Sequence, residues 1–316
     1  MSNIIYPADT ANIIKAAEII KNGGLVAMPT ETVYGLGANA YNAKAVAGIF
    51  AAKGRPAFNP LISHIADIDF LPTYARTDDR VMTLARRFWP GPLTMVLPRL
   101  DENPALDLAC AGLKTITVRF PAHPVAQELI RRSGVPIVAP SANKSQTISP
   151  TTAEHVRESL GDKVDMILDG GRCKVGVEST IIDVTGKDIV LLRAGGIAVE
   201  ELEEFLNQKV LISHGNPELP SSPGQLLKHY APAHPLRINA EDRKDGEFFI
   251  GFGNVSFSDL NLSPKGDLCE AAANLFAYLR FADRLPGYSG IAMSPIPENG
   301  LGLAINDRIR RAAYKA

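Results

Sequence analysis

Apolar residues recur along the chain with two spacings, and these spacings predict its helices and strands. Apolar positions three or four residues apart, as at Ile13, Ala17 and Ile20, favour an amphipathic helix. This spacing predicts helices at 10–22, 43–52, 78–88, 151–160, 199–206, 268–283 and 302–313. Thr151 and Glu154 are expected to form a capping box for the fourth of them. Short apolar or alternating runs predict strands at 25–28, 61–65, 115–120, 136–139, 164–168, 179–184, 189–192, 248–252 and 290–294.

The composition of the chain changes at residues 213–235, which are rich in proline, glycine and serine. Such a segment is typical of a linker rather than a packed element. The 316 residues suffice for two domains of roughly 100–200 residues each. We therefore predict a catalytic domain at 1–208, a Pro-rich linker at 209–236 and a small C-terminal domain at 237–316. The fold class is α/β: a twisted mixed sheet, followed by a small three-layer, Rossmann-like α/β domain.

The predicted strand Thr115–Phe120 has one apolar and one polar side. Every second side chain, from Ile116 to Phe120, is apolar, and the others are two threonines and Arg119. Alternate residues of a strand point to opposite faces of the sheet. One face of this strand is therefore suited to line a polar pocket.

Three polar segments contain no acid, although the chain as a whole is balanced, with 33 Lys+Arg against 34 Asp+Glu. They are residues 53–65, 114–119 and 139–152. In the first of them, Lys53 offers a compact charge and Arg55 a planar fork, and both suit phosphate or carboxylate. A basic surface loop is the simpler explanation of any one segment. Three such segments together predict one electropositive pocket that is assembled by folding.

Composition excludes several other classes of protein. A net charge of −1 and a pI near 6.6 argue against a protein that mainly grips a nucleic-acid backbone. Cys110, Cys173 and Cys269 are too far apart to suggest a disulfide framework or a CxxC metal pair. The cations beside Cys173 could lower its thiol pKa, but no adjacent histidine supports a nucleophile there. The start of the chain lacks signal-peptide features, and no apolar run approaches the ~18 residues of a membrane span. We expect a cytoplasmic protein with no membrane contact.

Two glycine-rich motifs are typical of nucleotide-binding proteins, and neither supports such a site in this chain. Residues 35–40 match G-x-G-x-x-A, but the segment PTETVY separates them from the preceding strand, and cations stand where a ribose-binding acid is expected. A dinucleotide site is therefore disfavoured. The chain contains no G-x-x-x-x-G-K-[ST] motif, so any ATP site is not a P-loop.

Five segments together resemble the signature segments of the YrdC-type threonylcarbamoyl-AMP synthase family. They occur in the family's order within about the first 200 residues: PTETVYGLG (29–37), KGRPAFNPL (53–61), TVRFP (117–121), PSANKSQTISPT (140–151) and GVESTIID (176–183). KHYAP at 228–232, followed by a small domain, resembles the long, two-domain form. Three residues depart from the pattern: Gln146 for glycine, Ala194 for proline and Gln225 for methionine. Glycine at position 146 could have served a positive φ.

The resemblance implies a nucleotidyltransferase that converts L-threonine, bicarbonate or CO2, and ATP to threonylcarbamoyl-AMP and pyrophosphate. The product would supply the machinery that transfers the threonylcarbamoyl group to tRNA. The assigned catalytic residues are Lys53, Arg55, Ser141 and Asn143. ATP contacts are assigned to Arg55, Asn59, Thr115, Ser141, Ser149, Arg193 and Tyr230. Threonine contacts are assigned to Thr32, His64, Arg119, Ala139 (through its backbone) and Ser179. No protein metal site is implied, because Mg²⁺ is expected to arrive on the triphosphate.

The residues leave two alternatives open. The first is an RNA-binding module without adenylylation activity, or at least a weak tRNA contact, because arginine pairs occur at 86–87 and 131–132. The second is a carbamoyl-adenylate enzyme for another amino acid, since the assigned pocket does not exclude serine. Tyr230 is further expected to close over the nucleotide, which would make the linker a lid that keeps water from labile intermediates.

Overall fold

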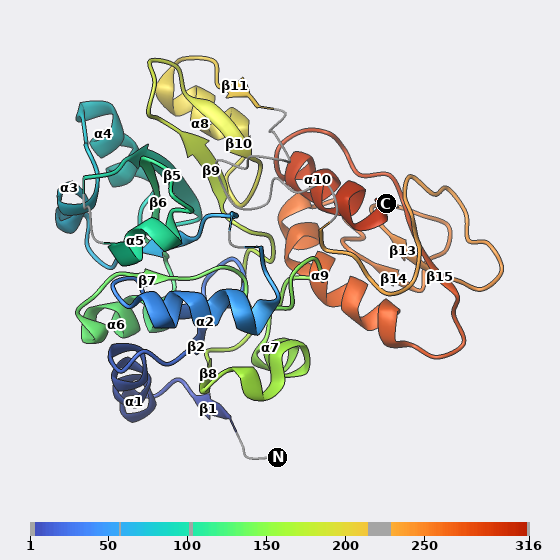
Figure 1. Cartoon of the computed structure of the whole chain (residues 1–316). Coiled ribbons are helices and arrows are strands. Elements are labelled where there is room, and N and C mark those ends of the chain that lie inside the picture. Colours follow the sequence, from blue (N-terminus) through green and yellow to red (C-terminus); the bar gives the residue numbers. More distant parts are fainter. Residues whose placement is uncertain (1–3, 57, 101–103, 214–228, 315–316) are drawn as a thin grey trace.

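The computed structural model describes residues 4–56, 58–100, 104–213 and 229–314, which form two bodies side by side (Figure 1). The larger body is a mixed sheet with helices on its faces. Its strands are β1 (Ile5–Pro7), β2 (Val26–Met28), β3 (Gly35–Asn39), β4 (Ile62–His64), β5 (Leu93–Pro98), β6 (Thr115–Arg119), β7 (Ile137–Val138), β8 (Met166–Asp169), β9 (Thr180–Asp183), β10 (Val190–Arg193) and β11 (Leu211–Ile212). Its α-helices are α1 (Thr10–Lys21), α2 (Ala43–Lys53), α3 (Leu71–Tyr74), α4 (Asp79–Phe88), α5 (Pro104–Ala109), α6 (Pro124–Ser133), α7 (Ala153–Leu160) and α8 (Val199–Leu206). Two 3₁₀ turns lie at Ile68–Phe70 and Gly161–Lys163.

The strands of the larger body follow the order β1-β8-β2-β3-β7-β4-β6-β5-β9-β10-β11. Both parallel and antiparallel pairs occur along this order, so the predicted mixed sheet is confirmed. The register sets His64 on β4 opposite Arg119 on β6, and Arg119 opposite Thr94 on β5. Residues that are far apart in sequence therefore meet at one place on the sheet.

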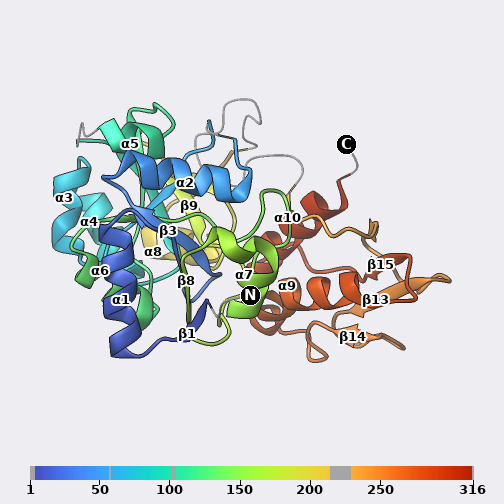
Figure 2. The ribbon, with the colours of Figure 1, turned by 60° about the horizontal axis from the view of Figure 1, so that its bottom comes forward.

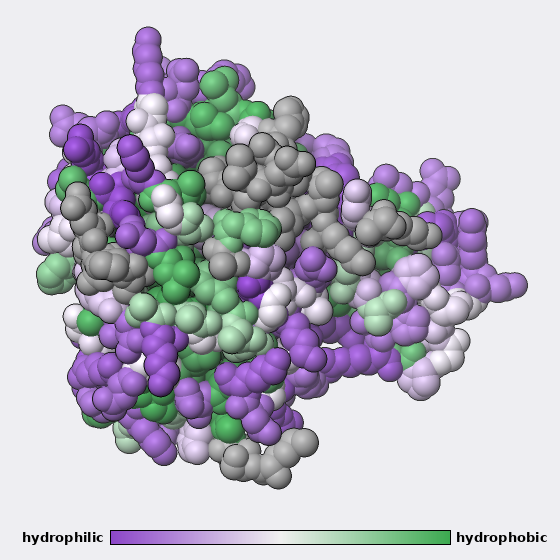
Figure 3. All heavy atoms as spheres, viewed as in Figure 1, coloured by the Kyte–Doolittle hydropathy of each residue, from purple (hydrophilic) through white to green (hydrophobic). Residues whose placement is uncertain are grey.

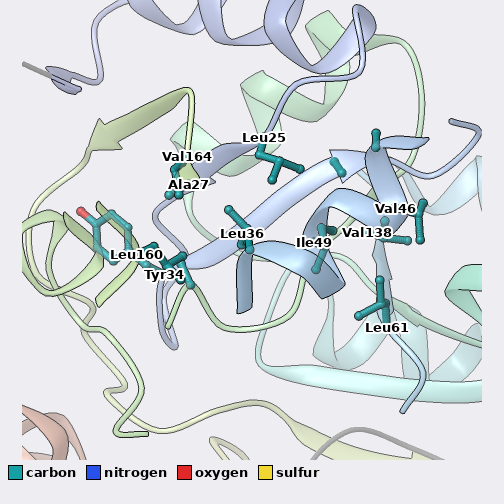
Figure 4. Packing of buried hydrophobic residues seen from close by; sticks show 14 of the residues in the cluster. Leu25, Ala27, Tyr34, Leu36, Val46, Ile49, Leu61, Val138, Leu160 and Val164 are labelled. Carbon is teal, nitrogen blue, oxygen red and sulfur yellow. The ribbon is translucent and has the colours of Figure 1, made fainter. Parts of the chain in front are cut away.

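Apolar side chains cover both faces of this sheet. On one face, Ile49 of α2 packs with Leu36, Leu61 and Val138 (Figure 4). Farther along the same face, the apolar side of β6 packs against α4 together with the side chains of β5, while α1 and α6 cover the opposite face at β2, β7 and β8. Each fully buried aliphatic side chain contributes about 1.5–3 kcal/mol to the free energy of unfolding. The polar side of β6 is thereby held at a fixed position.

The smaller body contains a four-stranded parallel sheet and two helices. Its elements are β12 (Leu236–Arg237), β13 (Glu247–Gly251), β14 (Leu260–Asn261), α9 (Leu268–Arg284), β15 (Gly290–Met293) and α10 (Leu301–Ala313). Both helices lie between this sheet and the larger body (Figures 1 and 2). We expected three layers, but the two described helices pack against each other on one face, and a loop residue, Ala240, packs against Phe249 on the other. The described part of the domain therefore has two layers of regular structure.

The domain limits can be compared with those expected. Strand β11 pairs with β10, so the larger sheet reaches Ile212, beyond the expected domain end at residue 208. Most of the predicted Pro-rich linker, residues 214–228, lies outside the described residues. Linker closure over the pocket therefore stays a prediction.

The structure corrects several sequence-based expectations. The G-x-G-x-x-A segment forms β3 rather than a phosphate-binding turn. A Cβ on Gly37 would lie 2.9 Å from Ile137 Cγ2, so glycine there lets β3 and β7 approach closely. The capping residue of α7 is Thr152, which accepts the backbone N–H of His155, and not Thr151. The thiol of Cys173 is buried, and burial raises its pKa to about 12 instead of lowering it.

Polar side chains cover much of the surface in Figure 3, with apolar patches between them. Within the described ranges, no helix is both long enough and apolar enough to cross a membrane.

Candidate active site

A pocket opens between the start of β3 and the ends of β4 and β6, where the last part of the predicted linker returns to the larger body. Its walls surround about 550 Å³ of space between atoms, part of which is open solvent. Its lining residues are Thr30, Thr32, Val33, Gly35, Arg55, Ile62, His64, Arg119, Ala139, Pro140, Ser141, Glu178, Ser179, Arg193, His229 and Tyr230. Three arginines and several hydroxyl groups thus face one hollow.

Arg119 occupies one end of the pocket and is held on three sides. Its guanidinium donates to Glu31 Oε1 at 2.5 Å, to Thr32 Oγ1 at 3.0 Å and to the carbonyl of Gly91 at 3.3 Å. Glu31 also accepts the backbone N–H of Ala122 at 3.0 Å. Such a fixed, buried fork is well placed to bind a second carboxylate.

His64 lies beside Arg119 as a consequence of the β4–β6 register. Burial and the charge of Arg119 lower the pKa of His64 to about 3, so its ring is neutral at physiological pH. Its Nδ1 lies 3.1 Å from the carbonyl of Ile62. Across the pocket, Ser179 Oγ lies 2.7 Å from Thr94 Oγ1. This end of the pocket combines one cation with neutral polar groups.

Arg55 and Arg193 supply the positive charge of the other end. Arg55 donates to the carbonyl of Pro60 at 3.1 Å, and Arg193 donates to the carbonyl of Ser179 at 2.9 Å. Burial lowers the pKa of each guanidinium to about 10, which still leaves both charged at neutral pH. Two buried cations near each other are costly unless an anion is shared between them.

Lys53 does not line the pocket but holds the loop that does. Its ammonium donates to the carbonyls of Ser141 and Asn143 at 2.5 Å each. Burial, together with the charge of Arg55, lowers the pKa of Lys53 well below its usual value. In the structure, Lys53 therefore fixes the position of Ser141.

Several buried polar atoms around this end lack a hydrogen-bond partner among the residues that the structure describes. They are Arg55 Nε, both amide atoms of Asn59, Asn143 Oδ1, His229 Nδ1 and Arg308 Nη2. Buried polar groups are nearly always satisfied. Of these residues, Arg55 and His229 line the pocket, where a polar ligand could satisfy their unpartnered atoms.

Most of the predicted site residues meet in this pocket: Thr32, Arg55, His64, Arg119, Ala139, Ser141, Ser179, Arg193 and Tyr230. Five others do not line it. Lys53 and Asn143 lie behind the Ser141 loop, Asn59 is buried nearby, and Ser149 donates to Glu178. Thr115 lies four residues before Arg119 on β6, about 13 Å along the strand.

Sequence reasoning missed the acids of the site, Glu31 and Glu178. Glu178 accepts from Ser149 Oγ at 2.5 Å and from Arg308 Nε at 2.9 Å. Burial alone would raise the pKa of Glu178, but the charges of Arg308 and Arg193 outweigh it and lower the pKa to about 2. Both acids occur inside segments that carried the family resemblance, and that was the signal that could have identified them.

Fold and pocket together define an α/β protein with a pocket that is lined by cations at the ends of central strands of a mixed sheet. Residues 18–195 match the Sua5, YciO and YrdC family model, which is described as telomere recombination. Residues 197–314 match the model described as the C-terminal domain of threonylcarbamoyl-AMP synthase.

Individual relatives agree with both matches. The threonylcarbamoyl-AMP synthase of Pyrococcus abyssi is 42% identical over 318 residues, covering 94% of this chain and 93% of the relative. The Bacillus subtilis enzyme of that name is 41% identical, covering 95% of this chain and 92% of the relative. The crystal structure of P. abyssi Sua5 complexed with L-threonine matches with a TM-score of 0.89 at 40% identity, covering 98% of this chain and 96% of that chain. This chain belongs to the threonylcarbamoyl-AMP synthase family, in its two-domain form.

Proposed function

We propose that this pocket joins L-threonine, bicarbonate or CO2, and ATP to give threonylcarbamoyl-AMP and pyrophosphate. The observation that carries the proposal is the meeting of Arg55, Arg119 and Arg193 in one pocket of a chain from this family. Three cations suit the two anionic substrates, a carboxylate and a triphosphate.

The threonine amine first adds to CO2 and loses a proton, which gives a carbamate. A carbamate oxygen then attacks the α-phosphorus of ATP, the bond from that phosphorus to the β-phosphate oxygen breaks, and pyrophosphate leaves. This chemistry needs no covalent nucleophile from the protein. Positioning and stabilisation of the charge on the leaving group therefore supply the acceleration.

We assign the nucleotide to the end of the pocket with Arg55, Arg193, Ser141 and Tyr230. The Arg55 Nε and His229 Nδ1 atoms, which belong to lining residues and lack described partners, support this assignment. Lys53 keeps the Ser141 loop in place, and its burial between carbonyls supports that role. Thr115 and Ser149 remain predicted ATP contacts.

We assign threonine to the end with Arg119, whose fork binds the carboxylate. Thr32, neutral His64, the backbone of Ala139 and Ser179 complete this half. Polar groups of this kind would be left unsatisfied by valine, and this favours a substrate that bears a hydroxyl group.

Mg²⁺ is proposed to enter as part of the ATP substrate. In the described ranges, no group of three or more His, Cys, Asp or Glu residues is placed to hold a metal ion. We place the reaction in the cytoplasm, where the product would pass to the enzymes that modify tRNA.

The test is mass spectrometry of the product formed from ATP, threonine and ¹³C-bicarbonate. The expected product is labelled threonylcarbamoyl-AMP, with an equal amount of pyrophosphate. Serine and valine in place of threonine test the alternative amino acids: a larger kcat/KM with either would reassign the substrate. Salt-dependent tRNA binding without pyrophosphate release would instead favour the RNA-binding alternative.

A further inference from the structure

Two arginines of the smaller domain reach into the larger domain behind the pocket. Arg308 of α10 is 0% exposed and donates to Glu178, which lines the pocket. Arg280 of α9 is also buried and donates to the backbone carbonyls of Ile148 and Ser149. Both side chains thus cross from the second domain to the wall of the active site.

These contacts connect α9 and α10 of the smaller domain through Ser149 and Glu178 of the larger domain. The carboxylate of Glu178 accepts from Arg308 through one oxygen and from Ser149 Oγ through the other. The backbone of Ser149 is held in turn by Arg280. We call Ser149, Glu178, Arg280 and Arg308 the interdomain network. Its two ends are α9 and α10, which pack against each other.

Arg308 also contacts the aromatic part of the nucleotide end. Its guanidinium carbon lies 5.4 Å from the ring centroid of Tyr230, within cation–π range. Tyr230 in turn stacks on Phe276 of α9 at 5.3 Å. The second domain therefore supports Glu178 and Tyr230, two lining residues of the cationic end.

Simple domain adhesion does not explain this arrangement. Arg284 of α9 pairs with Glu158 across the same interface, but those side chains are 48% and 38% exposed. An exposed pair costs little desolvation, whereas a fully buried one carries a large desolvation cost for each ion. The buried pair of Arg308 and Glu178 lies at the pocket wall. Its desolvation cost is explained if the pair fixes the position of Glu178 there.

We propose that Arg308 and Arg280 are positioning residues that shape the nucleotide half of the pocket through Glu178 and Ser149. The inference rests on the proposed function, because the proposed function assigns this half of the pocket to ATP. It makes the C-terminal domain part of the ATP site rather than an appended module.

The test compares Arg308→Met, Arg308→Lys and the control Arg284→Met in the full chain. Initial rates of pyrophosphate release give kcat and the KM values for ATP and threonine. We expect Arg308→Met to raise the KM for ATP at least tenfold and to leave the KM for threonine within about twofold. Arg308→Lys should recover part of the loss, and Arg284→Met should match the wild type. Equal effects of Arg308→Met and Arg284→Met, or equal changes in both KM values, would overturn the proposal.

Folding and function are separated by two further measurements. Glu178→Gln keeps the shape of the side chain but removes its charge, and we expect it to raise the KM for ATP in the same way as Arg308→Met if the latter does not fold. ATP binding is also measured by calorimetry. If the wild type binds ATP but makes no product, the proposed function is wrong. In that case, weaker ATP binding by Glu178→Gln would still support the role of the interdomain network. Unchanged ATP affinity in Glu178→Gln would refute it.

Discussion

Arg119 shows how a single residue serves both stability and recognition. Its guanidinium is buried against Glu31, with side-chain exposures of 4% and 10%. A buried pair is a poor source of net stability, but removing one partner leaves an uncompensated charge. The pair therefore holds a cation in the pocket at a cost that the rest of the fold must offset.

Arg119→Met should lower the free energy of unfolding by about 3–5 kcal/mol, because Glu31 would remain buried without its cation. Adding Glu31→Gln should recover part of that loss, since no buried charge is left. Urea unfolding of the single and double variants measures both values. The control Arg131→Met breaks an exposed pair with Glu128 and should cost at most about 1 kcal/mol. A double variant less stable than Arg119→Met would contradict this explanation.

At the level of residues, the sequence identified cations better than acids. The acid-free segments contain Lys53, Arg55 and Arg119, but a pattern defined by the absence of acids cannot reveal Glu31 or Glu178. Gln146, which stands where the family pattern has glycine, has a φ of 68°, in the region where glycine is favoured. Its carbonyl accepts the N–H of Ala231, so the loop is tied to the last part of the predicted linker.

Secondary-structure elements were predicted where periodicity was clear and missed where proline concealed them. The predicted helices at 10–22, 43–52 and 78–88 are all present. Strand β5 was missed because prolines at 90, 92 and 98 flank it, and α6 because it begins at Pro124. Proline is well tolerated at the first position of a helix. The order of strands depends on long-range pairing and could not be read from local patterns.

Thr152→Ala should lower the free energy of unfolding by about 1 kcal/mol, because α7 loses the side-chain cap on the His155 N–H. Thr152→Ser keeps a hydroxyl group and serves as the matched control. Thermal unfolding at constant pH compares the two variants with the wild type. If both variants lost the same stability, the capping hydrogen bond would not be the cause.

For the whole molecule, the close fit of the two domains is the main feature that the sequence did not predict. Gly176 of the larger domain touches the backbone of α9: a Cβ there would lie 2.4 Å from the carbonyl oxygen of Ala272. Arg172 donates to Ala273 of the same helix at 2.9 Å. The sequence indicated a second domain but gave no sign of how it docks.

Gly176→Ala should therefore push α9 away from the larger domain. Gly171 is a matched control, because it also has a positive φ, 81° against 77°, but its Cβ would meet nothing within 4 Å. Both variants share the cost of backbone strain, and Gly176→Ala should lose a further 1–3 kcal/mol or so from overpacking. Urea unfolding measures the difference. Equal losses would mean that the domains can separate slightly at no cost.

The interdomain network also bears on how the protein is made. Arg308 follows Glu178 by 130 positions, so the ribosome completes the larger domain well before α10. Domains tend to fold in the order in which they emerge. During that interval Glu178 lies in the pocket wall of the folded larger domain without Arg308 as its partner. If Arg308 has the role proposed above, the nascent chain cannot hold ATP well until α10 docks, and an interrupted translation product consumes none.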